Sequence, residues 1–173
     1  MQSHKTLIPE SHLKTRIREM ACDIEATYRN SHDLVLVCVL QGAKPFFEQL
    51  SAELSIPHRL ASIQVSSYGV GTYLSTGNVA VTQPLDADVT NADVLIVEDI
   101  IDTGHSMHTI LALLAAEKPH SVKVCALLSK PSRRAVSVPV DFLGFSIDDH
   151  FVFGYGIDVD QKYRELSYIG YFE

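Results

Sequence analysis

Three carboxylates within five positions are the residues of this sequence best suited to chemistry. Glu98, Asp99 and Asp102 follow an apolar segment, residues 94–97, and precede a turn of small polar residues. A continuous apolar run rich in β-branched residues is typical of a strand covered on both faces, as in parallel sheets. Open α/β sheets place ligands at the carboxyl ends of such strands. Carboxylates there are suited to sugar hydroxyls or to Mg²⁺.

The turn after the carboxylates is suited to binding a phosphate. The apolar pattern predicts a helix over about 107–118, so the turn supplies the unpaired N–H groups of a helix N-terminus, which favour an anion. Gly104 permits positive φ and close approach, and the neighbouring hydroxyls add donors. The residues of this predicted cradle are Thr103, Gly104, His105 and Ser106. The alternative is a plain helix start, with Asp102 or Thr103 as its cap.

A second strand, glycine turn and helix occur earlier in the chain. Residues 34–40 are apolar, Gln41 and Gly42 follow, and Pro45 lies in the first turn of a predicted helix. Two neighbouring strand ends that each open into a helix could hold the two ends of one polyanion. The alternative is that Gly42 serves only a tight turn.

The remaining pattern predicts an α/β fold with a largely parallel five-stranded sheet flanked by helices. A helix is expected over about 11–28, with Ser11 as a possible N-cap. Strands at 63–65 and 79–81 flank a segment rich in glycine and hydroxyl residues, about 66–77, which we expect to be a mobile loop. Further strands are expected at 122–128 and 140–145.

Length and charge limit the classes of protein. A chain of 173 residues is long enough for one domain, expected over 1–173, and it carries a net charge of −7, which argues against a nucleic-acid partner. It contains no apolar run of membrane-spanning length and no signal-peptide pattern, so we expect no membrane association and a cytoplasmic location. Cys22, Cys38 and Cys125 are expected to be buried, reduced thiols.

The segment 94–107 resembles the phosphoribosyl pyrophosphate (PRPP) motif of type I phosphoribosyltransferases. Residues 127–134, 142–147, 151–158 and 163–164 extend the similarity, in order, to the bacterial hypoxanthine phosphoribosyltransferases. The resemblance implies the fold of that family, with a small hood formed by the N- and C-terminal segments. It also implies a purine-salvage enzyme: with Mg²⁺, the 5-phosphoribosyl group passes from PRPP to N9 of hypoxanthine or guanine, giving IMP or GMP and pyrophosphate. The family forms homodimers and homotetramers.

The same resemblance implies roles for individual residues. Asp102 is the expected proton acceptor at purine N7, while 103–106 bind the 5′-phosphate. Glu98 and Asp99 contact the ribose hydroxyls and, with Asp158, the metal. The pyrophosphate contacts are Gln41, Gly42 and Arg164; the purine contacts are Lys130 to O6, a stacked Phe151 and the Val152 main chain; the loop that closes over the site carries Ser67 and Tyr68.

Gln41 departs from the family pattern, which usually has Lys or Arg at this position. The family often has a non-proline cis peptide beside this residue as well. The departure removes a cation near the leaving group but leaves the main-chain donors.

Two other functions remain open on sequence alone. A regulator built on the same fold would keep the phosphate cradle but should carry a basic face, which the net charge of −7 disfavours. A transferase for adenine, xanthine or a pyrimidine would share most motifs. Lys130 and Phe151 favour a 6-oxopurine.

Overall fold

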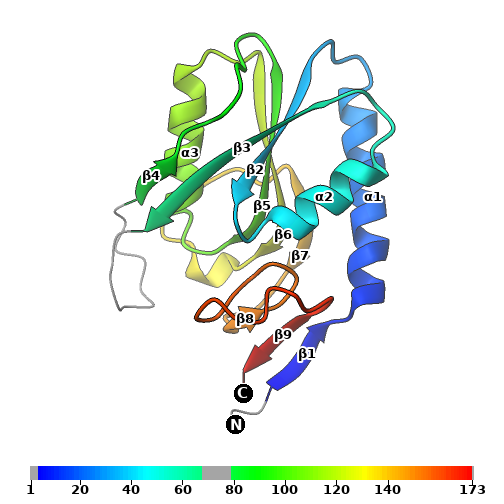
Figure 1. Cartoon of the computed structure of the whole chain (residues 1–173), viewed down its shortest axis with the longest axis vertical. Coiled ribbons are helices and arrows are strands. Elements are labelled where there is room, and N and C mark those ends of the chain that lie inside the picture. Colours follow the sequence, from blue (N-terminus) through cyan, green and yellow to red (C-terminus); the bar gives the residue numbers. More distant parts are fainter. Residues whose placement is uncertain (1–3, 68–78, 173) are drawn as a thin grey trace.

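The computed structural model describes residues 4–67 and 79–172, which form a large sheet and a small one (Figure 1). In the described chain the large sheet has the strand order β4-β3-β2-β5-β6-β7. The strands are β2 (Leu34–Leu40), β3 (Arg59–Ser67), β4 (Val79–Gln83), β5 (Asp93–Ile101), β6 (Ser121–Ser129) and β7 (Phe142–Ser146). Five of them are parallel, as predicted, and β4 joins as an antiparallel edge strand beside β3.

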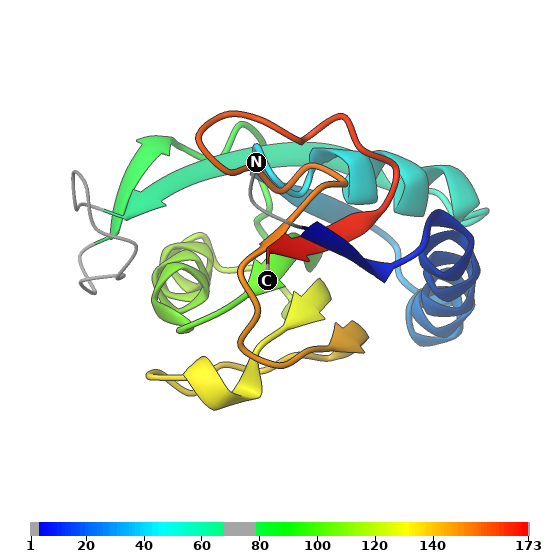
Figure 2. The same ribbon diagram turned by 90° about the horizontal axis from the view of Figure 1, so that it is seen from below.

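Helices cover both faces of this sheet because alternate strand residues point to opposite sides. Leu36 and Leu95 belong to the core under α1 (Glu10–Tyr28) and α2 (Lys44–Glu53). Val37 and Ile96 belong to the core under α3 (His105–Ala116). Figure 2 shows α3 apart from the other two helices. None of the helices in the described residues is long and apolar enough to cross a membrane.

Two predictions about α1 are wrong. The helix begins at Glu10 after Pro9, which is extended and offers no side-chain cap, so Ser11 lies inside the first turn and is not the N-cap. Cys22 is exposed, whereas Cys38 and Cys125 are buried as predicted. The reason is helical geometry: Ala21 faces the core, and the next residue is rotated by about 100° toward solvent.

A small antiparallel sheet confirms the hood implied by the resemblance. It has the order β1-β9-β8, so strands from the two ends of the chain pair with each other. The strands are β1 (His4–Ile8), β8 (Val152–Phe153) and β9 (Ile169–Phe172). The Phe153 ring is fully buried between Tyr163 and Phe172, with centroid distances of 4.9 and 4.6 Å. Figure 1 places this hood on the side where the parallel strands end.

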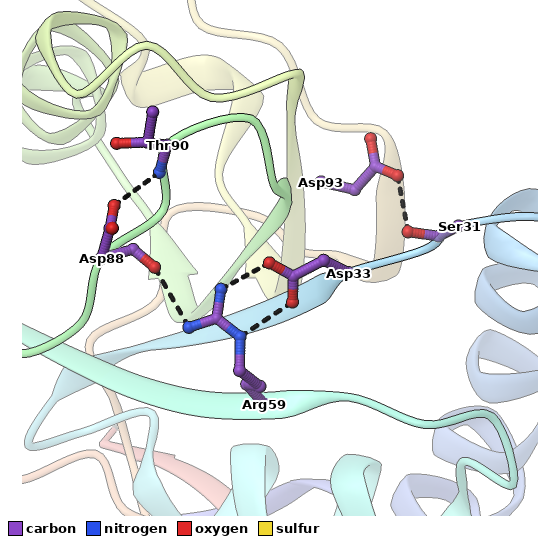
Figure 3. Close-up of polar contacts among 6 residues, drawn as sticks. All are labelled: Ser31, Asp33, Arg59, Asp88, Thr90 and Asp93. Carbon is purple, nitrogen blue, oxygen red and sulfur yellow. Dashed lines mark hydrogen bonds and ion pairs between the residues drawn. The ribbon is translucent and has the colours of Figure 1, made fainter.

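A polar network stabilises the opposite end of the sheet, where the strands begin (Figure 3). Arg59, the first residue of β3, donates two hydrogen bonds to Asp33, at 2.8 and 2.6 Å, and a third to the carbonyl of Asp88, at 3.1 Å. Asp88 in turn accepts from the Thr90 N–H. These contacts fix the starts of β2 and β3 relative to the loop that leads into β5.

Asp93, the first residue of β5, lies in the same region (Figure 3). Its carboxylate accepts hydrogen bonds from the hydroxyls of Ser31 and Ser121, both at 2.6 Å, and lies 2.8 Å from His120 Nδ1. Burial by itself would raise the pKa of Asp93, but the hydrogen bonds from Ser121, Ser31 and His120 outweigh it and lower the pKa to about 2. The charged Asp93 carboxylate therefore connects the start of β5 to the segments that precede β2 and β6.

Candidate active site

The acidic pair lies within β5 and not after it. The strand extends past the apolar run to Ile101, so the predicted strand end was wrong by several residues. Asp99 lies against Gly42, in the turn that leads into α2. Glu98 is only 7% exposed.

Burial dominates the electrostatics of this pair. It raises the pKa of Glu98 well above the ordinary value, and the neighbouring Asp99 charge adds to the effect. Burial also raises the pKa of Asp99, although hydrogen bonds and the Arg164 charge oppose it. Glu98 accepts the Asp99 backbone N–H at 3.2 Å. Two adjacent carboxyls of which one is buried and one half-buried are stabilised in their charged forms only when a cation or donors approach them.

A pocket of about 430 Å³ opens beside Asp99. Five of the predicted site residues, from three distant parts of the chain, line this pocket: Gln41, Gly42, Asp99, Asp158 and Arg164. The lining residues are Leu40 at the end of β2, Gln41 and Gly42 after it, Gln64 and Val65 of β3, Asp99 of β5, and Ile157, Asp158, Gln161 and Arg164 of the segment between β8 and β9, here called the hood segment. The Leu40–Gln41 peptide is cis, as the resemblance implies. Glu98 does not line the pocket.

Two glycines allow these segments to meet. A Cβ on Gly42 would lie 1.8 Å from Asp99 Oδ2, and one on Gly156 would lie 2.1 Å from the Gly42 carbonyl oxygen. Both distances are far below van der Waals contact, so a side chain at either position would displace its neighbour. Gly42 is therefore required for the close approach of the Asp99 carboxylate, beyond any need of the turn.

The pocket lining carries more negative than positive charge. Arg164 is the single cation in the lining, and its Nη2 already lies 2.6 Å from Asp158 Oδ1. Arg164 also donates to the Gly156 carbonyl at 2.7 Å, and Asp158 accepts the Gln161 N–H at 2.8 Å. Two carboxylates against one paired arginine would repel a free polyanion.

No group of three or more His, Cys, Asp or Glu side chains in the described chain is arranged around a common metal position. Mg²⁺ in nucleotide sites keeps several waters and takes one or two carboxylates together with substrate phosphates. Asp99 and Asp158 both line the pocket and are the carboxylates that could hold such an ion.

The predicted phosphate turn begins α3. Gly104 is the N-cap residue, with φ of +93°, and no side chain caps the helix, so the capping alternative for Asp102 and Thr103 is wrong. Within the described residues, the N–H groups of residues 103–106 donate to no other group. The Thr103 carbonyl accepts from the N–H groups of residues 135 and 136, at 2.9 and 3.0 Å, which braces the turn. The free donors at a helix N-terminus match a phosphate.

Lys130 and Asp102 mark a second polar region beside the turn. Lys130 directly follows β6, its side chain is 7% exposed, and its N–H donates to the Ile101 carbonyl at 3.0 Å. Arg133 and Asp149, which the sequence reasoning missed, lie between the two predicted residues. Arg133 Nε donates to Asp102 Oδ1 at 3.1 Å, and Asp149 Oδ1 lies 3.8 Å from Lys130 Nζ. Arg133 occurs in the motif 127–134, but nothing in the sequence indicates its partner.

The remaining predicted residues are the purine contacts Phe151 and Val152 and the loop residues Ser67 and Tyr68. Phe151 precedes β8, is 45% exposed and has its ring centroid 6.4 Å from that of Phe172. Val152 is buried and pairs with Tyr171 of β9. Ser67 is the last residue of β3, while Tyr68 and most of the predicted loop 66–77 lie outside the described residues.

Comparison with known proteins extends the similarity well beyond the turn. The family model of the phosphoribosyl transferase domain matches residues 7–162. Hypoxanthine phosphoribosyltransferase of Escherichia coli K12 is 46% identical over 167 residues, which cover 96% of this chain and 93% of that protein. The structure of a Staphylococcus aureus hypoxanthine phosphoribosyltransferase matches with a TM-score of 0.92 and 34% identity, covering 98% of this chain and 91% of the other. A Bacillus anthracis hypoxanthine-guanine phosphoribosyltransferase matches with a TM-score of 0.92, 35% identity and complete coverage of both chains.

Proposed function

The chain belongs to the phosphoribosyltransferase family, and from this premise we propose how its residues divide the work of hypoxanthine salvage. The activity is that of a hypoxanthine phosphoribosyltransferase. N9 of hypoxanthine or guanine forms a bond to C1 of PRPP, the bond from C1 to the pyrophosphate oxygen breaks, and a nucleoside 5′-monophosphate is formed. The observation that supports this assignment of roles is the meeting of the β2 turn, Asp99 and the hood segment in one pocket.

The pocket is the proposed pyrophosphate end. The Gln41 and Gly42 main chain and Arg164 would contact the leaving group, while Asp99 and Asp158 would hold Mg²⁺. When bound, Mg²⁺ neutralises the charge that gathers on the departing pyrophosphate. Glu98, which accepts the Asp99 N–H, and Asp99 are the proposed contacts to the ribose hydroxyls, and Glu98 is also a proposed residue of the metal site.

The α3 turn is the proposed site of the 5′-phosphate, held by the N–H groups of 103–106 and by the hydroxyls of Thr103 and Ser106. We assign His105 a main-chain contact only. Because the turn is braced by residues 135 and 136, its donors are preorganised for the anion.

Asp102 and Lys130 are the proposed polar contacts to the purine. Asp102 would accept the N7 proton as N9 becomes bonded to C1, and Lys130 would donate to O6. A buried ammonium that loses its acceptor is costly, so a purine with an amino group at C6 is rejected. Phe151 would stack on the base, with the Val152 main chain at its edge. Ser67 and Tyr68 are the proposed residues of a closing loop.

Assembly and location are also proposals. We infer a homodimer or homotetramer of a domain that spans 1–173, to be measured by light scattering. A cytoplasmic location is supported by the three free cysteines, which suit a reducing compartment.

The decisive experiment is nucleotide formation from PRPP with hypoxanthine, guanine, xanthine and adenine supplied separately, with and without Mg²⁺. We expect turnover of hypoxanthine or guanine only when Mg²⁺ is present, with adenine inert. Asp102→Asn should lower turnover about 10²- to 10⁴-fold while PRPP binding persists. Unchanged turnover would remove Asp102 from proton transfer. PRPP binding without turnover of any base would favour a regulator, which the acidic net charge disfavours.

A further inference from the structure

Four side chains of alternating charge connect the two proposed purine contacts. Lys130 Nζ lies 3.8 Å from Asp149 Oδ1, which lies 3.6 Å from Arg133 Nε. The same Arg133 Nε donates to Asp102 Oδ1 at 3.1 Å. The row therefore runs from the expected O6 donor to the expected N7 acceptor.

Local backbone geometry explains why both cations reach this region. The Arg133 N–H donates to the Lys130 carbonyl at 3.1 Å, closing a single 3₁₀ turn at Pro131–Arg133. Residues three apart in such a turn lie on the same side. The Lys130 N–H is itself bonded to the Ile101 carbonyl, directly before Asp102. One short turn thus fixes both cations relative to the end of β5.

The contact with Arg133 involves one oxygen of the Asp102 carboxylate and leaves the other, Oδ2, available. Arg133 binds Oδ1, and no other described group bonds to Asp102. The Asp102 side chain is 38% exposed and the Arg133 side chain 30% exposed, so the pair lies at the surface of the site, accessible to a substrate. A hydrogen bond to one oxygen of a carboxylate fixes the direction in which the other oxygen points.

We propose that Arg133 is a positioning residue for purine binding. It holds Asp102 by Oδ1 so that Oδ2 faces N7 of the purine, and Asp149 couples the same guanidinium to Lys130. The spacing between the N7 acceptor and the O6 donor is then set by one ion-pair row. This inference rests on the proposed function, because Asp102 must be the N7 acceptor for its orientation to matter.

This proposal predicts that loss of Arg133 impairs the reaction of the purine base and leaves PRPP binding unchanged. Without Arg133 the Asp102 carboxylate loses its one described partner and samples several rotamers, and a displacement of about 1 Å can lower a rate about 10²-fold. The α3 turn keeps its own brace from residues 135 and 136, so the phosphate contacts stay in place.

The test is a double-mutant cycle on Arg133 and Asp102, with kcat and KM measured for hypoxanthine and PRPP. We expect Arg133→Met to lower kcat/KM for hypoxanthine about 10- to 100-fold, with the Kd of PRPP unchanged by calorimetry. Arg133→Lys, which restores the charge, should recover part of the loss. In the Asp102→Asn background Arg133→Met should change the rate by no more than about twofold, because the residue on which it acts has been neutralised.

The controls separate this role from folding and from the proposed function. Arg29→Met removes an exposed arginine at the C-cap of α1 and should leave both constants unchanged. If Arg133→Met lowers the melting temperature, Arg133→Gln replaces it in the cycle. Equal effects of the Arg133 change in both backgrounds, or a loss confined to PRPP binding, would overturn the proposal. Absence of turnover in the unmodified protein would instead refute the proposed function itself.

Discussion

Gly42→Ala tests whether the Asp99 carboxylate must lie where the structure places it. The added methyl carbon would lie 1.8 Å from Asp99 Oδ2 and 2.9 Å from its Cγ. Ordinary contact begins near 3.4 Å, so the carboxylate oxygen must withdraw by about 1.6 Å. Because the clash involves the end of a side chain and not backbone, rotation of Asp99 can relieve it while the fold stays intact.

The expected consequence is a selective functional loss. A displacement of that size at the proposed metal and ribose contact should lower kcat/KM for PRPP about 10²-fold and weaken Mg²⁺-dependent pyrophosphate binding. Calorimetry of pyrophosphate at several Mg²⁺ concentrations measures the second effect directly, and the melting temperature reports any damage to the fold.

A space-relieving variant provides the matched control. Asp99→Ala removes the atoms with which the new methyl collides, so adding Gly42→Ala to it should produce no further loss. If Gly42→Ala alone leaves both the rate and pyrophosphate binding unchanged, the position of the carboxylate does not matter to the reaction, and the reasoning from the pocket fails. A large additional loss in the double variant would show that the glycine acts through the turn itself.

Three further perturbations address other parts of the molecule. Gln41→Lys adds a cation to a pocket whose one arginine is already paired, so we expect the Mg²⁺ concentration for half-maximal pyrophosphate binding to fall about fivefold; Asn30→Lys, at an exposed position on the opposite edge of the sheet, should not change it. Lys130→Ala should reduce discrimination between hypoxanthine and adenine about 10- to 100-fold, the value of a hydrogen bond to a charged group, and full retention of selectivity would refute the assignment. Asp93 has a lowered pKa, so its carboxylate stabilises the fold fully above the ordinary pKa of 3.8 and loses this effect as the pH falls toward 2. The difference in unfolding free energy between the unmodified protein and Asp93→Asn, measured with urea, should therefore shrink by about 2 kcal/mol between pH 5 and pH 2, whereas a constant difference would contradict it.

The sequence predicted the fold well where burial leaves a local signal. Residues 34–40 form β2 over the predicted span because a strand covered on both faces is apolar throughout. The same rule made the predicted β5 too short, since the strand pairs with β6 at Glu98, Ile100 and Ile101 although two charged residues interrupt the apolar run. Cys22 was misplaced because neighbouring helix positions differ in exposure by their angle alone.

The candidate site was predictable in its turns but not in its pairings. Gly104 and Gly42 occur shortly after apolar runs, and this pattern indicates tight strand-to-helix connections. The contacts of Gly42 with Asp99 and Gly156 depend on how three segments pack, and no local pattern reports that. For the same reason Arg133 was visible as part of a motif, while its ion pair with Asp102 was not.

The two ends of the site differ in how charge is balanced. At the proposed purine end the protein supplies both signs itself, with Lys130 and Arg133 set against Asp102 and Asp149. At the pyrophosphate end the lining has two carboxylates and one paired arginine, and Gln41 contributes no charge. If the proposed roles hold, a neutral base binds without an added ion, whereas a polyphosphate needs cations from solution to offset the negative lining. The distribution of side-chain charge thus supports the proposal that the metal acts at the leaving-group end and that the residues following β5 and β6 select the base.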